Sequence, residues 1–153
     1  MSNPTKVTSN CNVASIRVQN PNTSYMFFLY WLDFLRPFHK LTSVETKILA
    51  AILHERFILS KVVTDDKLLD RIVLNKDSRK KYIETCNINS NNLSVTISSL
   101  KDKGVIIDNR INMRYVPNIK HDCTHYEMVL NFAIDKPPID ETTIQTGSTQ
   151  EDL

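Results

Sequence analysis

Glycine is nearly missing from this sequence, which has two glycines in 153 residues. Loops that cradle phosphate groups, such as the Walker and Rossmann loops, need glycines because their backbones adopt positive φ angles and approach the ligand closely. The scarcity of glycine therefore argues against a nucleotide-dependent enzyme. The sequence also has no local signature of a nucleophile with its base. We expect neither an enzyme nor a bound cofactor.

Cysteines and long apolar runs are also scarce. Cys11, Cys86 and Cys123 are odd in number and widely spaced, which argues against a disulfide framework and is typical of a reducing compartment. No early segment has the pattern of a secretion signal, and the longest apolar run is too short to cross a bilayer. We therefore expect a cytoplasmic protein without a membrane partner.

The formal net charge of +2 hides an uneven distribution of charge. Residues 36–121 hold 16 Lys and Arg against 9 Asp and Glu, a balance of +7, whereas residues 135–153 hold 1 against 5, a balance of −4. A basic region of this kind is typical of proteins that bind a polyanion, although a solvated surface is the ordinary explanation of any short charge run.

Composition divides the chain into one domain and two tails. Residues 1–12 are rich in Asn, Ser and Thr, and residues 136–153 form an acidic, aperiodic run, so we predict that both ends are flexible. Residues 13–135 suit one domain, because 41% hydrophobic and 24% charged residues are a globular mixture. Within it, residues 13–19 predict a short strand, and residues 126–134 follow the two-residue period of another.

The most aromatic segment is YMFFLYWLDFL, residues 25–35. With Phe38 it holds seven of the twelve aromatic residues, and Asp33 is its single charge before Arg36 and Pro37 end it. We predict a helix that is apolar nearly all round, which must be covered either as the central strut of the domain or by a partner chain. The candidate residues for a homodimer interface are Phe27, Phe28, Tyr30, Trp31 and Phe34.

Three further helices are predicted between this segment and residue 86. Thr42 and Glu45 form a capping box that opens an amphipathic helix. A short amphipathic helix follows over residues 65–74, and a basic helix begins at Ser78. The inward residues predicted for these helices are Val44, Ile48, Leu49, Ile52 and Phe57, then Leu68, Leu69, Ile72 and Val73, then Tyr82 and Ile83.

Residues 87–104, NINSNNLSVTISSLKDKG, predict a turn and one more helix. Ser90 is a good N-cap, and Gly104 is well placed as the stop. The apolar side of this helix carries Leu93, Thr96, Ile97 and Leu100. Residues 105–107 and 111–116 then predict a hairpin whose turn uses Asp108, Asn109 and Arg110.

The order of these elements, with a helix ending in LKDKG and the hairpin VIIDNRINMRYVPN, resembles a winged helix-turn-helix. Residues 79–118 are similar to the MarR-type regulators and, through a wing ending in Tyr115, Val116, Pro117 and Asn118, to the winged-helix domains of plasmid and phage replication initiators. The resemblance implies a mainly α fold with a small β wing (α+β). The aromatic helix would precede the core at residues 79–118, and a strand would follow it.

The resemblance also implies that the helix from Ser90 to Lys103 enters the major groove of duplex DNA. Asn suits adenine and Val95 suits the methyl group of thymine, which favours an AT-rich site. The candidates for base contacts are Asn91, Asn92, Ser94, Val95 and Ser98. The candidates for phosphate contacts, two of them on the wing, are Arg79, Lys80, Lys81, Lys101, Lys103, Arg110 and Arg114.

Two functions fit these features. The first is a DNA-binding transcriptional regulator or replication-initiation factor in a host cytoplasm, encoded by a phage or mobile element as the Asn- and Ile-rich composition suggests. MarR-type proteins are similar in dimerising through terminal helices, which implies two symmetric reading helices. The alternative is a structural or assembly protein, such as a phage virion component, which packs against other subunits. The uncharged outward face of the reading helix favours this alternative.

The segment HDCTH contains three side chains of the types that bind zinc. His121, Cys123 and His125 would share one face of an extended segment. A structural zinc normally has four protein ligands, and the fourth is not evident. We therefore favour a polar loop and predict no metal site.

Overall fold

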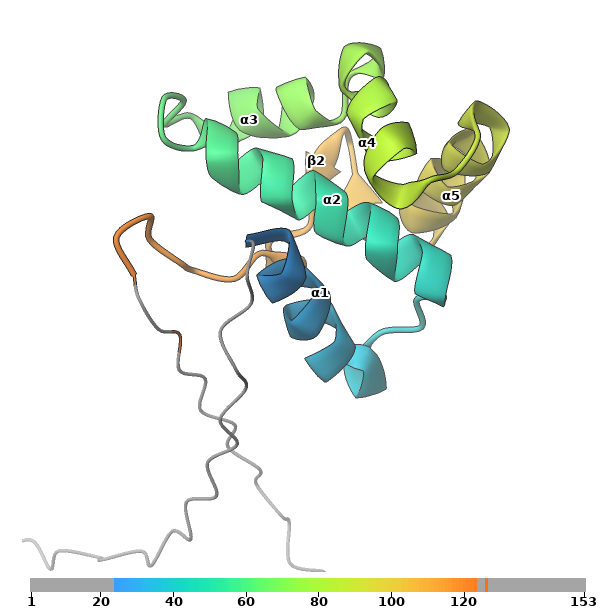
Figure 1. Cartoon of the computed structure of the whole chain (residues 1–153), viewed down its shortest axis with the longest axis horizontal. Helices are drawn as coiled ribbons and strands as arrows, with labels where there is room; N and C mark the ends of the chain where they lie inside the picture. The colour runs from blue at the N-terminus through green and yellow to red at the C-terminus, as the bar shows by residue number, and fades with distance from the viewer. Residues whose placement is uncertain (1–23, 124–125, 127–153) are drawn as a thin grey trace, which may run out of the picture. The chain divides into compact units, whose positions relative to one another are not determined.

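The computed structural model describes residues 24–123 and Tyr126 (Figure 1). These residues are mainly helical and include one small antiparallel sheet of two strands, as the sequence predicts. The tails, the predicted strand at residues 13–19 and all of the predicted strand at residues 126–134 except Tyr126 lie outside the described residues. The chain divides into two compact units at Asp122, and the elements below belong to the first.

Helix α2 (Ser43–Leu59) is the central element of this unit. Helix α1 (Ser24–Phe34) crosses one side of it, while α3 (Asp66–Val73), α4 (Arg79–Cys86) and α5 (Ser90–Asp102) pack on its other sides (Figure 1). The apolar residues of α2 that are at most 3% exposed are Ile48, Leu49, Ala50, Ala51, Ile52 and Leu53. The strut of the domain is therefore α2, and α1 is a cover over it.

The predicted capping box at the start of α2 is confirmed. The amide of Glu45 donates to Thr42 Oγ1 (3.3 Å), and the amide of Thr42 donates to Glu45 Oε2 (2.7 Å). The prediction that Val44 lies inward is wrong, because its place in the first turn leaves it 46% exposed. Phe57 is half-buried against the core.

Helices α3 and α4 are each eight residues long and bury one stripe of side chains. Asp65 caps α3, and Leu69 and Val73 are buried. The prediction that Leu68 lies inward is wrong, since a helix of two turns covers too narrow an arc and Leu68 stays 43% exposed. Tyr82 of α4 is buried and donates its hydroxyl to the carbonyl of Val73 (2.7 Å).

A three-residue turn joins α4 to α5. Asn87 adopts the left-handed conformation (φ 51°) that ends α4, a role that glycine more often fills. The N-cap of α5 is Asn89 and not the predicted Ser90, because Asn89 is extended and its Oδ1 accepts from the amide of Asn92 (2.8 Å). Ser90 is the first helical residue.

The far end of α5 closes as predicted at Gly104, whose φ is +72°. The amide of Gly104 donates to the carbonyl of Lys101 (3.0 Å), and the amide of Val105 donates to the carbonyl of Leu100 (2.9 Å). These two bonds make a Schellman motif. Because Val105 and Leu100 are both fully buried, the motif also turns the chain into the core.

The predicted hairpin is present but shorter than expected. Strand β1 (Ile106–Ile107) pairs with β2 (Arg110–Ile111) through a two-residue turn, in which Asp108 and Asn109 have positive φ angles of 51° and 56°. Arg110 is therefore in the strand and not in the turn. The second strand ends at Ile111, because the Asn112 side chain accepts from the amide of Arg114 and starts the 3-10 helix η3 (Met113–Tyr115).

Candidate nucleic-acid interface

The outward side of α5 is open to solvent. Leu93, Thr96 and Leu100 are buried against the core. All five residues predicted to contact bases are exposed: Asn91, Asn92, Ser94, Val95 and Ser98. A shallow depression lined by Ser94, Val95, Ser98, Ser99 and Asp102 runs along this side.

Four of these exposed residues form one line, which we call the α5 stripe: Asn91, Val95, Ser98 and Asp102. Their spacing of four, three and four residues places them above one another on a helix. The single charge of the stripe is Asp102, at its C-terminal end. The first two turns therefore present an amide, a hydroxyl and an apolar side chain, none of them charged.

Glu45 of α2 fixes the position of α5. This carboxylate is 5% exposed and accepts from Ser99 Oγ (2.5 Å) and Lys103 Nζ (2.7 Å). Burial by itself raises the pKa of Glu45, yet the hydrogen bonds from Lys103, Ser99 and the amide of Thr42 outweigh it and lower the pKa from 4.5 to about 2. The residue predicted for a capping box thus also holds the last turn of α5.

Three of the seven predicted phosphate contacts have no partner among the described residues. They are Arg79 and Lys80 at the start of α4 and Lys101 near the end of α5. Lys80 and Lys101 are exposed, and Arg79 is half-buried. A second shallow depression, lined by Lys101, Ile106, Asp108 and Asn109, connects Lys101 with the turn of the hairpin.

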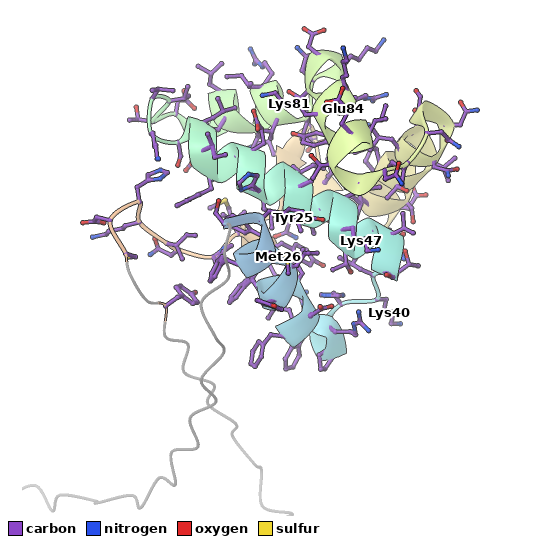
Figure 2. All side chains as sticks on the ribbon, viewed as in Figure 1. Tyr25, Met26, Lys40, Lys47, Lys81 and Glu84 are labelled. Atoms are coloured by element: carbon purple, nitrogen blue, oxygen red, sulfur yellow. The ribbon has the colours of Figure 1, made fainter. Side chains whose placement is uncertain are left out.

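Three other cations are bound within the chain. Lys81 of α4 (Figure 2) pairs with Glu55, and Lys103 pairs with Glu45 and donates to the carbonyl of Lys40 (2.8 Å). Arg114 lies in η3, outside the hairpin, and donates to the carbonyl of Phe38 (3.1 Å). The prediction that Arg114 projects from the wing is therefore wrong, because the chain leaves the strand before reaching it.

Arg110 is the seventh cation, and it belongs to a network around the fully buried Asp70. Asp70 Oδ1 accepts from Arg56 Nε (2.8 Å), while its Oδ2 accepts from the amide of Ile111 (3.3 Å) and lies 3.7 Å from Arg110 Nε. One carboxylate thus ties α2, α3 and β2 together. Sequence reasoning missed Asp70, although an acidic residue beside Leu69 on the inward side of α3 was a usable signal.

The predicted dimer residues on α1 differ in exposure. Phe28 is 2% exposed and packs edge-to-face on Phe57, so the core of its own chain already covers it and the prediction is wrong for this residue. Phe27 and Trp31 are half-buried, and Trp31 Nε1 donates to the carbonyl of Tyr115 (3.0 Å). Tyr30 and Phe34 remain 43% exposed.

Burial also shifts the pKa values of three side chains away from α5. Near the start of α1 (Figure 2), burial together with Cys86 raises the pKa of Tyr25 to about 12. Burial also raises the pKa of the Cys86 thiol and lowers the pKa of His54. Both Tyr25 and Cys86 are therefore protonated at neutral pH.

The described residues contain neither a metal-ligand cluster nor a membrane-spanning helix. Within residues 24–123 and Tyr126, no three His, Cys, Asp or Glu side chains gather as a metal site would require. His125 of the HDCTH segment lies outside these residues. Over the same residues, no helix has the length and apolar character needed to span a bilayer.

Comparison with protein-family models, with curated proteins and with solved structures finds no match to this chain.

Proposed function

We propose that the chain is a winged helix-turn-helix protein that binds duplex DNA, with α5 as the helix that enters the major groove. Its role would be that of a transcriptional regulator or replication-initiation factor of a phage or mobile element, acting in the host cytoplasm. The order α4, three-residue turn, α5 and hairpin supports this proposal. So does the packing of both helices on α2, which is how such a motif is held.

One observation carries the proposal: the α5 stripe is uncovered and uncharged over its first two turns, and three cations on α5 and on α4, which packs on α5, have no partner among the described residues. Base edges are read by neutral donors, acceptors and methyl groups, whereas phosphates are gripped by cations. The stripe supplies the first kind of group, and Arg79, Lys80 and Lys101 supply the second. The exposed amides at the start of α5 add a partial positive charge.

Fluorescence anisotropy with a labelled AT-rich duplex, measured over a series of salt concentrations, tests the proposal. Three phosphate contacts predict a slope of about −3 for log K against log salt, compared with about −6 if all seven cations took part. Absence of binding at about 50 mM salt contradicts DNA recognition, because phosphate contacts are strongest there.

A charge-reversed variant makes the test specific to this surface. Lys80→Glu combined with Lys101→Glu is expected to lower affinity at least tenfold, whereas Lys61→Glu should have little effect. Lys61 follows the C-terminal end of α2, whereas Glu45 binds α5 at the N-terminal end of the same helix. Lys81 and Lys103 are left unchanged, since replacing them would break ion pairs within the fold.

A specific observation also favours the second candidate, a structural or assembly protein such as a virion component. Tyr30 and Phe34, one turn apart on α1, are each 43% exposed, and Phe38, in the 3-10 helix that follows (Arg36–Phe38), is 50% exposed; we call these three residues the aromatic row. This aromatic row suits contact with protein subunits. Under this candidate, substitutions in the row abolish assembly, while Lys80→Glu with Lys101→Glu leaves it unchanged.

A further inference from the structure

We propose that Val95 contacts the C5 methyl group of thymine, so that the ligand class is duplex DNA with A·T pairs under the N-terminal half of α5. This inference rests on the proposed DNA binding and deepens it. Val95 would distinguish thymine from the other bases by its methyl group, in addition to the hydrogen bonds that Asn91 can make to adenine.

Val95 differs from the other apolar residues of α5 in its exposure and its position. Val95 is 69% exposed, and among the large hydrophobic residues that the structure describes, only Val62, in the turn after α2, is more exposed. A single exposed apolar residue usually needs no explanation. Val95, however, lies at the middle of the α5 stripe, one turn from Asn91 and one turn from Ser98, both exposed.

The side chain of Val95 is also stiff. A β-branched residue in a helix has one strongly preferred χ1 rotamer, so both methyl groups of Val95 point in a fixed direction. Little conformational entropy is then lost when they meet a partner. A long flexible apolar side chain at this position would lack that advantage.

The chemistry of the groove supplies the partner. In the major groove, thymine presents the one exposed methyl group of the four bases, and adenine presents a donor and an acceptor that a side-chain amide matches. Asn91 and Val95 are one turn apart, about 5–6 Å, which exceeds the rise of about 3.4 Å between base pairs. The two side chains would therefore meet neighbouring or next-but-one A·T pairs.

Asp102 determines which half of α5 approaches the DNA. Its carboxylate lies at the end of the same stripe, about 10 Å from Val95 along the helix axis, and it would repel phosphates. The C-terminal half must therefore tilt away from the duplex. The N-terminal half, with Asn91, Ser94 and Val95, then points into the groove.

The test compares two duplexes that differ only in the thymine methyl group. An alternating A·T duplex of about 30 base pairs is paired with the same duplex containing deoxyuridine for thymidine, and the affinity of the full chain is measured for each by anisotropy at low salt. Loss of one buried methyl contact is expected to weaken binding about three- to fourfold. Val95→Ala should bind the two duplexes equally, and Val95→Ile should keep the preference.

The variants separate a methyl contact from an effect of methylation on duplex shape. Such an effect would change the ratio of the affinities for the thymidine and deoxyuridine duplexes equally in the wild type and in Val95→Ala. It therefore cancels when this ratio is compared between the two proteins. Because Val95 is exposed, the substitution leaves the core intact. Equal affinity of the wild type for both duplexes, or a preference that persists in Val95→Ala, overturns the methyl contact while DNA binding stands. If the wild type binds neither duplex, both proposals fail.

Discussion

Two buried carboxylates determine how the elements of this unit meet. Glu45 joins the start of α2 to the end of α5, and Asp70 joins α2 and α3 to the hairpin. A buried charge is tolerated only when it is paired and hydrogen-bonded. Both carboxylates meet this condition, and each therefore positions a surface proposed to contact DNA.

The lowered pKa of Glu45 predicts a dependence of stability on pH. Its folded-state pKa of about 2 lies below the ordinary value of 4.5, so its contribution is fully present above pH 4.5 and is lost as the pH falls towards 2. The shift corresponds to about 3 kcal/mol. Glu45→Gln should lose about 2 kcal/mol of unfolding free energy at pH 7 and show a smaller further loss between pH 5 and pH 2.

Urea denaturation at a series of pH values measures this effect. Glu84→Gln, an exposed position on α4 (Figure 2), serves as the matched control and should follow the wild-type curve. Parallel acid curves for Glu45→Gln and the wild type would contradict the assignment of the shift to Glu45.

Asp70 predicts a second loss of stability. Asp70→Asn leaves the guanidinium of Arg56, which is 7% exposed, without a buried counter-charge, and removal of one partner of a buried pair costs about 3–5 kcal/mol. Asp66 binds the same arginine through its other nitrogen but is 57% exposed. Asp66→Asn should therefore cost less than about 1 kcal/mol in the same urea titration, and equal losses would contradict the role given to Asp70.

Sequence reasoning could reach only half of this network. The pairing of Thr42 with Glu45 is local, since the two residues are three positions apart, and their types alone predicted it. Ser99 and Lys103, which also bind Glu45, lie 54 and 58 positions away. No periodicity or cap indicates a contact at that separation, and so the shared role of Glu45 became evident only from the fold.

Specific capping residues fix both ends of α5. Asn87 ends the preceding helix, Asn89 caps α5, and Gly104 closes it with a left-handed residue. A change at either end should alter stability without touching the α5 stripe, because the stripe residues make none of these contacts.

Gly104→Ala tests the C-terminal end. A Cβ built at this position meets no atom within 4 Å, so the change introduces no steric clash. The φ of +72° nevertheless costs an L-residue about 1–2 kcal/mol. We expect a decrease of that size in the free energy of unfolding, measured in urea, with the slope of the transition unchanged. Gly104→Asn should lose less, as Asn tolerates this conformation better, and an unchanged Gly104→Ala would contradict the strain argument.

The elements themselves were predictable where apolar spacing and caps agreed. Helix α2 carried both signals and was predicted from its first residue, and Gly104 was predicted as a stop. The sequence-based predictions were wrong where only one of these two signals was present. Val44 and Leu68 matched the apolar spacing but lie on sides of their first helical turns that the core does not cover. The second strand of the hairpin ended early because the side chain of Asn112 accepts a local hydrogen bond from the amide of Arg114.

Helix α1 and the segment after it expose aromatic side chains that contact with a second copy of the chain would cover. Helix α1 covers α2 with Phe28 and Leu32, yet Tyr30 and Phe34 on α1 and Phe38 in the 3-10 helix after it stay exposed. The charges beside the row, Asp33 and Arg36, neutralise each other at 2.9 Å. A twofold contact through this row would present two α5 helices to one duplex.

This arrangement predicts a dimer that one substitution disperses. Phe34→Ser removes the central aromatic of the row, and because Phe34 is 43% exposed the unit should stay folded, with an unchanged far-UV circular dichroism spectrum. Sedimentation equilibrium is expected to show a dimer for the wild type and a monomer for Phe34→Ser. Val62→Ser, an equally conservative loss of an exposed apolar residue away from the row, should remain dimeric.

A dimer formed through the row would also link it to the proposed DNA binding. Two reading helices on one duplex multiply the affinity of a single helix through effective concentration, so Phe34→Ser should bind a duplex with an inverted repeat of A·T tracts at least tenfold more weakly, while its affinity for a single tract stays the same. A compact wild-type monomer in the ultracentrifuge would refute the twofold arrangement. The aromatic row would then belong to a contact with a different protein, as in the assembly candidate.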